Sequence, residues 1–288
     1  MGNYFAIVTS RNSENGIKSA LLSLKNQALG PEYVIVIDDG SKDSTPEILK
    51  ELQQSWTELF IITNPDMGYD ISRVVKNWNA ALELVRNRNM VRTDYHLIAT
   101  DDTEYAPDYA FKLISYLDSN PEVAIASGNY TNHKPEMPHG AGRYVRNTVF
   151  EKTRWKGSYP EQMGYESAIL YEVEFLGYKY SVIEEARFRH LRPLGLNHRF
   201  YEFGASMHTL GYHPMYALGR FAKYFLTGTV TGRLGSLYMI YYYLTYRAEI
   251  QGYSRLYDTQ LRQYVRKKQS DRIKRILNMR ILKKQLRS

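Results

Sequence analysis

Three apolar runs in the first hundred residues each end in a polar or acidic turn, and helical patterns separate them. The runs cover residues 4–8, 34–37 and 97–99, and the turns after them begin at Thr9, Asp38 and Thr100. Strands that alternate with helices favour βαβ units and a parallel arrangement. A β-branched run such as residues 34–37 is typical of a strand buried on both faces. We therefore predict an α/β fold with a mostly parallel central sheet flanked by helices.

The third run ends in two adjacent carboxylates, Asp101 and Asp102. Neighbouring carboxylates repel each other and lose hydration at the end of a buried strand. A divalent cation that bridges them to a phosphate would offset that cost. Such a pair also occurs on solvated surfaces, so the pair alone is a moderate signal. In parallel sheets, however, ligands bind at the carboxyl ends of the strands, where all three polar turns should meet.

Composition limits the chemistry and the location. The 288 residues include no cysteine, which excludes disulfides, thiolate metal sites and a cysteine nucleophile. We see no basic-then-apolar leader and no run of about 18 uncharged apolar residues. These features lead us to expect a cytoplasmic protein, with the inner face of the cell membrane as an alternative location.

The order of the motifs resembles a known family. Thr9-Ser10-Arg11-Asn12, then Asp38-Asp39-Gly40-Ser41, then Ala99-Thr100-Asp101-Asp102 is similar to the family 2 glycosyltransferases with the GT-A fold. The spore-coat polysaccharide type also has Thr-Asp-Asp as its metal motif, where many relatives have Asp-x-Asp. The resemblance covers residues 3–195. It implies a catalytic domain over residues 1–195, with a nucleotide-sugar half (1–108) and an acceptor half (109–195), followed by a helical extension (196–288).

The resemblance implies roles for residues of the first two motifs. Thr9 and Arg11 would line the nucleotide pocket. Asp39 would accept a hydrogen bond from the base, which suits the N–H group of uracil or thymine. Asp38 would hold the loop. Arg73 would contact a phosphate; Lys76 is an alternative, and so is a plain solvated charge on a helix.

The resemblance also implies a metal site for Mn²⁺ or Mg²⁺. Asp102 would bind the cation, which clamps the diphosphate, and Asp101 would contact the ribose or the surroundings of the metal. His190 would lie near the metal or the diphosphate, although a lone histidine is equally often structural. Hard divalent cations prefer oxygen ligands and are often held by one or two carboxylates plus substrate phosphates.

Transfer with inversion needs a carboxylate that takes the proton of the acceptor hydroxyl. In the family this residue opens a helix, in a Glu-Asp pair about eleven residues before a Gly-Tyr landmark. Here the landmark is Gly177-Tyr178, and Tyr165-Glu166 stands in place of the pair. Glu166 is therefore the candidate base. Glu166 has an alternative role as a first-turn acid that the helix dipole favours. Three nearby glutamates, Glu161, Glu172 and Glu174, are competing candidates for the base.

Two segments have less specific patterns. Residues 130–160 are expected to form a loop over the acceptor side. The C-terminal region combines Tyr-rich helical segments with a basic tail from Arg262, whose only acid is Asp271. Such a region suits peripheral contact with a membrane, packing on the catalytic domain, or a homodimer contact, and the sequence leaves all three open.

These patterns lead to one principal hypothesis. The chain is expected to be a metal-dependent, inverting glycosyltransferase that uses a nucleotide-diphosphate sugar of UDP or dTDP type and a glycan or lipid-linked acceptor. A nucleotide-sugar-binding or scaffold protein on the same fold is the alternative. A nucleotidyltransferase is disfavoured because no Gly-rich phosphate loop follows the first strand. No nucleic-acid partner is expected, because the basic residues form no recognition module.

Overall fold

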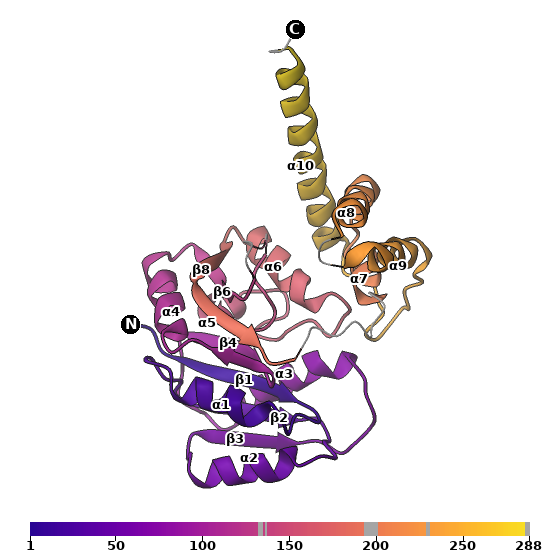
Figure 1. Cartoon of the computed structure of the whole chain (residues 1–288). Coiled ribbons are helices and arrows are strands. Elements are labelled where there is room, and N and C mark those ends of the chain that lie inside the picture. Colours follow the sequence, from indigo (N-terminus) through magenta and orange to yellow (C-terminus); the bar gives the residue numbers. More distant parts are fainter. Residues whose placement is uncertain (132–134, 136, 193–200, 229–230, 286–288) are drawn as a thin grey trace. The chain divides into compact units, whose positions relative to one another are not determined.

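The computed structural model describes residues 1–131, 135, 137–192, 201–228 and 231–285. Figure 1 shows the chain with its elements labelled. The described helices and strands are, in chain order, β1 (Tyr4–Ser10), α1 (Ile17–Lys25), β2 (Val34–Asp38), α2 (Thr45–Gln54), β3 (Leu59–Thr63), α3 (Ser72–Asn87), β4 (Tyr95–Thr100), β5 (Thr103–Tyr105), α4 (Tyr109–Ser119), β6 (Val123–Asn129), β7 (Arg143–Arg146), α5 (Asn147–Phe150), α6 (Tyr165–Phe175), β8 (Lys179–His190), α7 (Tyr201–Thr209), α8 (Pro214–Thr227), α9 (Gly232–Thr245) and α10 (Thr259–Gln285).

Contacts within the chain define two compact units. The first unit comprises residues 1–160 and 172–194, and the second comprises residues 161–171 and 195–288. Residues 161–171 thus group with the C-terminal helices, which the sequence did not suggest. The predicted domains, residues 1–195 and 196–288, stay a prediction.

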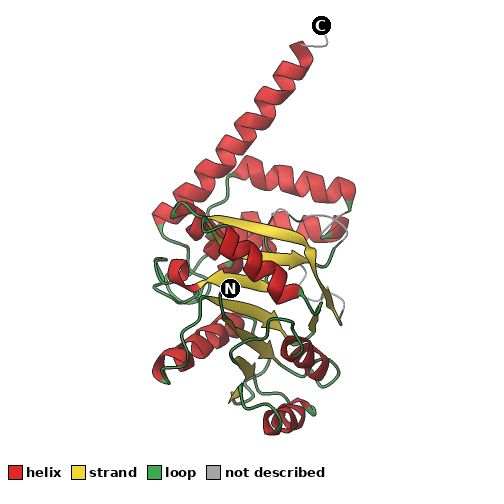
Figure 2. Cartoon of the chain, turned by 90° about the vertical axis from the view of Figure 1, so that its left-hand side faces the viewer, coloured by secondary structure: helices red, strands yellow, loops and turns green. Residues whose placement is uncertain are grey.

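The strands described in the first unit form a mixed sheet in the order β3-β2-β1-β4-β7-β6-β8-β5. Strands β3, β2, β1 and β4 are parallel, as predicted. Strand β7 is antiparallel to both of its neighbours, β4 and β6, and β5 is antiparallel to β8. The predicted α/β class is confirmed, with a sheet less uniformly parallel than expected. Figure 2 shows the strands in yellow with helices beside them.

The prediction of a loop over residues 130–160 is wrong in part. This segment contains β7, which lies inside the sheet, and the short helix α5. Residues 143–145 pair with both β4 and β6, and Arg146 pairs with β4. A four-residue strand is too short to show an alternating pattern. Its stability comes from hydrogen bonds to two distant strands, which no local signal records.

The core explains why the parallel strands are apolar throughout. Alternate residues of β1, including Ala6 and Val8, pack with side chains of α1, α2 and α4 in one large cluster. The residues between them, Phe5 and Ile7, are also buried and belong to the opposite side of the sheet. Helix α3 packs against β1 and β2. A strand that is covered on both faces has apolar residues at every position, and apolar and polar residues do not alternate along it. The β-branched run of β2 indicated this arrangement.

The register of the parallel strands brings their carboxyl ends level. Thr9 at the end of β1 pairs with Thr100 of β4, and Ser10 pairs with Asp38 of β2. Asp38 in turn pairs with Thr63 of β3. The three polar turns predicted from the sequence therefore begin at the same edge of the sheet.

The second unit contains α7, α8, α9 and α10, together with the first part of α6. Helices α7 and α9 approach closely at Gly204, where an added side chain would meet Tyr242 and the backbone of α9. Among the described residues, no helix has both the length and the apolar character needed to cross a bilayer.

Candidate functional site

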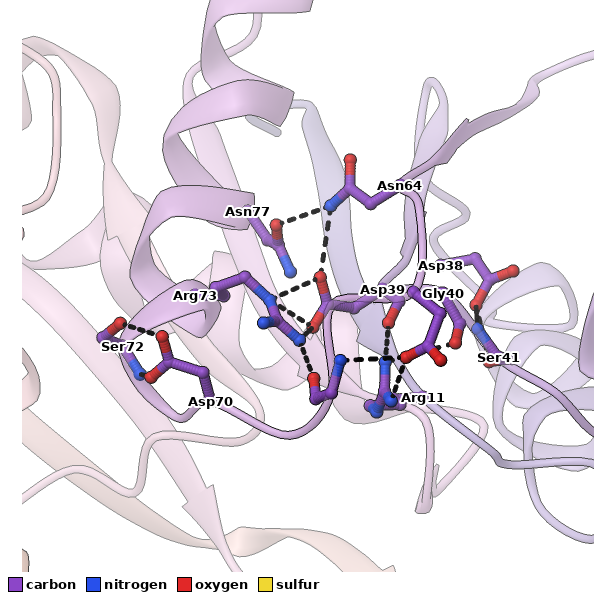
Figure 3. Close-up of polar contacts among 12 residues, drawn as sticks. Arg11, Asp38, Asp39, Gly40, Ser41, Asn64, Asp70, Ser72, Arg73 and Asn77 are labelled. Carbon is purple, nitrogen blue, oxygen red and sulfur yellow. Dashed lines mark hydrogen bonds and ion pairs between the residues drawn. The ribbon is translucent and has the colours of Figure 1, made fainter.

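A buried ion pair lies at the end of β2. Arg73, in the first turn of α3, donates from Nε and Nη2 to Asp39 Oδ2 at 2.9 and 2.7 Å, and Asn64 donates to Oδ1 at 3.3 Å (Figure 3). Both charged side chains are about 10% exposed. Burial raises the pKa of Asp39, but the hydrogen bonds from Arg73 and Asn64 more than reverse this, so its pKa is lower than usual. Asp39 is thus held as a carboxylate in a fixed orientation.

The loop that follows β2 is fixed by its own side chains. Asp38 accepts hydrogen bonds from the Ser41 backbone N–H at 3.1 Å and from the Ser41 hydroxyl at 2.5 Å. This geometry bears out the expectation that Asp38 holds the loop. Gly40 has a φ of +71° and lies against the backbone of Asp66, where a side chain would collide.

Arg11, which directly follows β1, binds to the loops that follow β2 and β3. Its guanidinium donates to the Asp39 and Gly40 carbonyl oxygens and forms an ion pair with Asp66 at 2.6 Å. Asp66 also pairs with Lys42 at 2.5 Å. The loops after β1, β2 and β3 are therefore joined by charged hydrogen bonds, and Asp66 is a member of this cluster that the sequence did not single out.

Asp101 is buried at the end of β4. Its Oδ2 accepts hydrogen bonds from the Arg11 backbone N–H at 3.2 Å and from the Ser13 hydroxyl, and its Oδ1 accepts one from Arg192 at 2.6 Å. Burial raises the pKa of Asp101, and Arg192 and Ser13 offset this only in part. Asp101 thus connects the first and third polar turns.

Asp102 is more open than Asp101 and has a different set of partners. Thr100 donates to its Oδ1 at 2.8 Å, and His190 Nδ1 lies 3.5 Å from the same oxygen. Burial raises the pKa of Asp102, but the hydrogen bonds from His190 and Thr100 outweigh it, and the pKa is lower than usual. The side chain keeps 20% of its surface exposed. It is therefore an anionic oxygen ligand that solvent can reach.

The pairing of β5 with β8 explains how a residue so far along the chain reaches Asp102. In this antiparallel pair Thr103 stands opposite His190. The Thr103 hydroxyl lies 3.1 Å from His190 Nδ1, and the Tyr130 ring packs edge-on against the imidazole. The structure thus brings together Asp102 and His190, the two residues that the family resemblance assigned to the metal.

Asp102 and His190 are compatible with a divalent cation. Two ligands at about 2.1 Å from an octahedral ion, at right angles, lie about 3 Å apart. His190 Nδ1 and Asp102 Oδ1 lie 3.5 Å apart, so a cation held by both would displace the proton through which His190 now hydrogen-bonds to Asp102. No group of three or more His, Asp or Glu side chains suited to a metal occurs in the described part of the chain. A cation here would take its remaining ligands from phosphate and water, as Mg²⁺ commonly does.

Arg192 is a site residue that sequence reasoning missed. Its Nη2 lies 2.6 Å from Asp101 Oδ1, and its Nε lies 3.6 Å from Asp102 Oδ2. Arg192 follows His190 by two residues. The pairing of β8 with β5 therefore brings both residues close to Asp101 and Asp102. That pairing joins segments more than eighty residues apart, and a single sequence carries no signal of it.

Glu166 lies in the first turn of α6, as predicted. It belongs to the second unit, whereas Asp39, Asp101 and Asp102 belong to the first. Of its competitors, Glu172 is buried and accepts a hydrogen bond from Arg154 Nε at 2.7 Å, which gives it a structural role. The assignment of Glu166 as the base stays a prediction.

The ion pair of Asp39 makes a testable contribution to stability. Because its pKa is lower in the folded than in the unfolded chain, the contribution is complete above about pH 4 and is lost as pH falls through the folded pKa. We expect the difference in free energy of unfolding between wild type and Asp39→Asn, from urea titrations, to shrink below about pH 4.

A surface pair provides the control for this measurement. Asp108 and Lys112 form an exposed pair at 2.7 Å, so Asp108→Asn should change stability by only a few tenths of a kcal/mol at each pH. A wild-type to Asp39→Asn difference that stayed constant down to about pH 3 would contradict the ionic role of the pair.

The curated proteins to which this chain is similar are named as glycosyltransferases. Three curated relatives are an O-antigen chain rhamnosyltransferase, RfbN, of Salmonella typhimurium (25% identical; 62% of this chain, 53% of the relative), an uncharacterized glycosyltransferase of Haemophilus influenzae (29%; 43% and 35%) and a putative glycosyltransferase, EpsH, of Bacillus subtilis (24%; 42% and 32%). The matched parts amount to between about a third and a half of these relatives.

Solved structures share the fold. The mannosyltransferase PcManGT from Pyrobaculum calidifontis, in complex with GDP-Man and Mn²⁺, superposes with a TM-score of 0.58 at 15% identity, over 82% of this chain and 69% of that one. Residues 1–349 of TarS from S. aureus give a TM-score of 0.53 at 16% identity, over 72% and 63%. The fold is that of the GT-A glycosyltransferases. The model of the glycosyl transferase family 2 matches residues 5–183, and the chain belongs to this family.

Proposed function

We propose that this chain transfers a sugar from a nucleotide-diphosphate donor of UDP or dTDP type, with inversion, to a hydroxyl of a glycan or lipid-linked acceptor. Mn²⁺ or Mg²⁺ is the proposed cofactor. One observation carries the proposal: the aligned ends of β1, β2 and β4 bring Arg11, Asp39, Asp101 and Asp102 to one edge of the sheet.

Asp39 is proposed to recognise the base. Three N–H groups, two from Arg73 and one from Asn64, point at its carboxylate. The Nε–H of Arg73 lies between the two oxygens, 3.1 Å from Oδ1 and 2.9 Å from Oδ2, so a pyrimidine N–H would share one of these oxygens with a donor that is already present. Arg73 thus fixes the orientation of the carboxylate that the base would approach.

Asp101 and Asp102 are proposed to interact with the other parts of the donor, the ribose and the diphosphate. Asp101, which is buried and bonded to the loop after β1, is proposed to contact the ribose. Asp102 and His190 would hold the cation, which when bound stabilises the charge that develops on the departing diphosphate. The Thr100 hydroxyl orients the Asp102 carboxylate. Arg192, beside both carboxylates, adds positive charge at the place where the diphosphate would lie.

Glu166 is proposed to take the proton of the acceptor hydroxyl while the hydroxyl oxygen attacks the anomeric carbon of the donor sugar. The bond to the diphosphate breaks on the opposite face of the sugar, and the configuration inverts. A first-turn helical carboxylate is compatible with this role, since it is held on a regular element.

Known proteins support the reaction class. One solved structure with this fold is that of TarS from S. aureus in complex with UDP-GlcNAc, and the PcManGT structure contains GDP-Man and Mn²⁺. The Salmonella relative is named as a rhamnosyltransferase of the O-antigen chain.

The test is turnover with a panel of donors. We expect release of nucleoside diphosphate from UDP- or dTDP-sugars in Mn²⁺ or Mg²⁺, and at least about tenfold slower release from GDP-sugars, because one misplaced hydrogen bond to a buried charge costs that much. The Asp39→Asn variant should lose most of this preference. Equal or faster turnover of GDP-sugars would contradict the role of Asp39, and no turnover of any donor would contradict the proposed reaction.

A further inference from the structure

Helix α8 exposes apolar side chains on the side that faces solvent. Met215, Leu218 and Leu226 are 61, 50 and 75% exposed. They follow one another at spacings of three and eight residues, which places them on one side of a helix. Ala217, on the other side, is fully buried. A surface helix usually has the reverse arrangement.

Helix α9 has the same reversed pattern. Leu234, Leu237 and Leu244 are 66, 45 and 69% exposed, at spacings of three and seven residues, and Tyr241 lies on the same side. The opposite side contains Met239, which is fully buried. Helices α8 and α9 pack against each other in the second unit. We refer to Met215, Leu218, Leu226, Leu234, Leu237 and Leu244 as the leucine surface.

The inner side of α9 and the N-terminal end of α8 already have their partners. Tyr243 of α9 accepts a hydrogen bond through its carbonyl oxygen from His208 of α7 at 3.0 Å, if the ring nitrogen carries the proton, and its hydroxyl donates to the Tyr212 carbonyl at 2.9 Å. His213, which caps α8, donates its backbone N–H to Gln269 of α10 at 2.7 Å. The packing of the second unit thus fixes which sides face outward, and the leucine surface is one of them.

The chain segment that contains α8 and α9 includes basic residues and no acid. Residues 203–248 contain no Asp or Glu. Lys223, Arg233 and Arg247 lie in this range and are exposed. A second copy of the same surface would bring like charges together, whereas an anionic surface would neutralise them. Exposed tyrosines such as Tyr241 are typical of the boundary between lipid and water.

We propose that the leucine surface docks on an anionic lipid bilayer, with the leucines among the acyl chains and the three cations at the headgroups. Helices of this type lie in the plane of the interface and combine buried apolar area with electrostatic attraction. This inference goes beyond sugar transfer and does not depend on it, because it rests on residues outside the candidate site.

The test is partition of the full chain onto vesicles. Vesicles of phosphatidylcholine with about 30 mol% phosphatidylglycerol should bind the wild type, and pure phosphatidylcholine should bind it several-fold more weakly. The double variant Leu234→Gln/Leu244→Gln should bind the anionic vesicles at least about tenfold more weakly, since two large apolar side chains no longer enter the lipid. The pair Met215→Gln/Leu226→Gln tests α8 in the same way.

A matched variant separates lipid docking from general stickiness. Val91 and Phe111 of the first unit are also exposed, at 60 and 49%, and Val91→Gln/Phe111→Gln should bind the vesicles like the wild type. All substitutions are at exposed positions, and an unchanged Tm would exclude unfolding as the cause. Failure of the wild type to bind anionic vesicles, or undiminished binding by both leucine variants, would overturn the proposal. So would a wild-type dimer that the leucine variants dissociate without a loss of vesicle binding.

Discussion

Asp102→Asn is expected to reduce sugar transfer by about a thousandfold or more, because a cation that stabilises the leaving diphosphate contributes several kcal/mol to the transition state. The asparagine retains the size of the side chain and a carbonyl oxygen that can accept from Thr100, which now lies 2.8 Å from Asp102 Oδ1. The loss would therefore come from the missing charge. The measurement is kcat over a series of Mn²⁺ concentrations, with Tm as a check on folding.

A charge-matched control makes this result specific. Asp108→Asn removes one carboxylate from an exposed surface pair of the same unit and should leave kcat unchanged. If Asp102→Asn kept transfer within about threefold of the wild type at saturating Mn²⁺, Asp102 would not be the metal ligand.

Glu166→Gln is expected to reduce kcat by about a hundredfold to ten-thousandfold, the range that a positioned general base supplies. The amide cannot take the proton of the acceptor hydroxyl, yet it fills the same volume in the first turn of α6. Binding of UDP should be unchanged, because the residues proposed to hold the nucleotide belong to the first unit. Calorimetry with UDP and Mn²⁺ measures this separately from turnover.

The competing glutamates provide the comparison. Glu161→Gln and Glu174→Gln should retain transfer. If either of them lost turnover while Glu166→Gln retained it, the base would be reassigned to that residue. Weaker UDP binding by Glu166→Gln would instead show that this residue acts on the sugar donor.

The parts of the site that lie at strand ends could be predicted from the sequence. Each parallel strand is an uninterrupted apolar run, and the polar residue after it marks where the strand ends. Thr9, Asp38 and Thr100 could therefore be placed at one edge of the sheet. The register of β1 with β2 and β4 agrees with that placement. Local pattern and topology rules suffice for such features.

Pairings between distant segments could not be predicted in the same way. Arg73 was expected to contact a phosphate, and the structure shows it bound to Asp39, thirty-four residues upstream. Arg192 and Asp66 enter the site through contacts with loops far from them along the chain. Strand β7 is held by two neighbours and has no pattern of its own. Each of these depends on tertiary packing, which a charge or a short run of residues does not record.

The central claim is that the first unit binds a nucleoside diphosphate together with a divalent cation. The most direct measurement is thermal unfolding with UDP, with Mn²⁺ and with both, since a ligand raises stability according to its concentration relative to its Kd. We predict that UDP and Mn²⁺ together raise the Tm by more than the sum of their separate effects. The excess should disappear in Asp102→Asn and persist in Glu166→Gln. A Tm that Mn²⁺ leaves unchanged with UDP, dTDP and every other nucleoside diphosphate would contradict the claim.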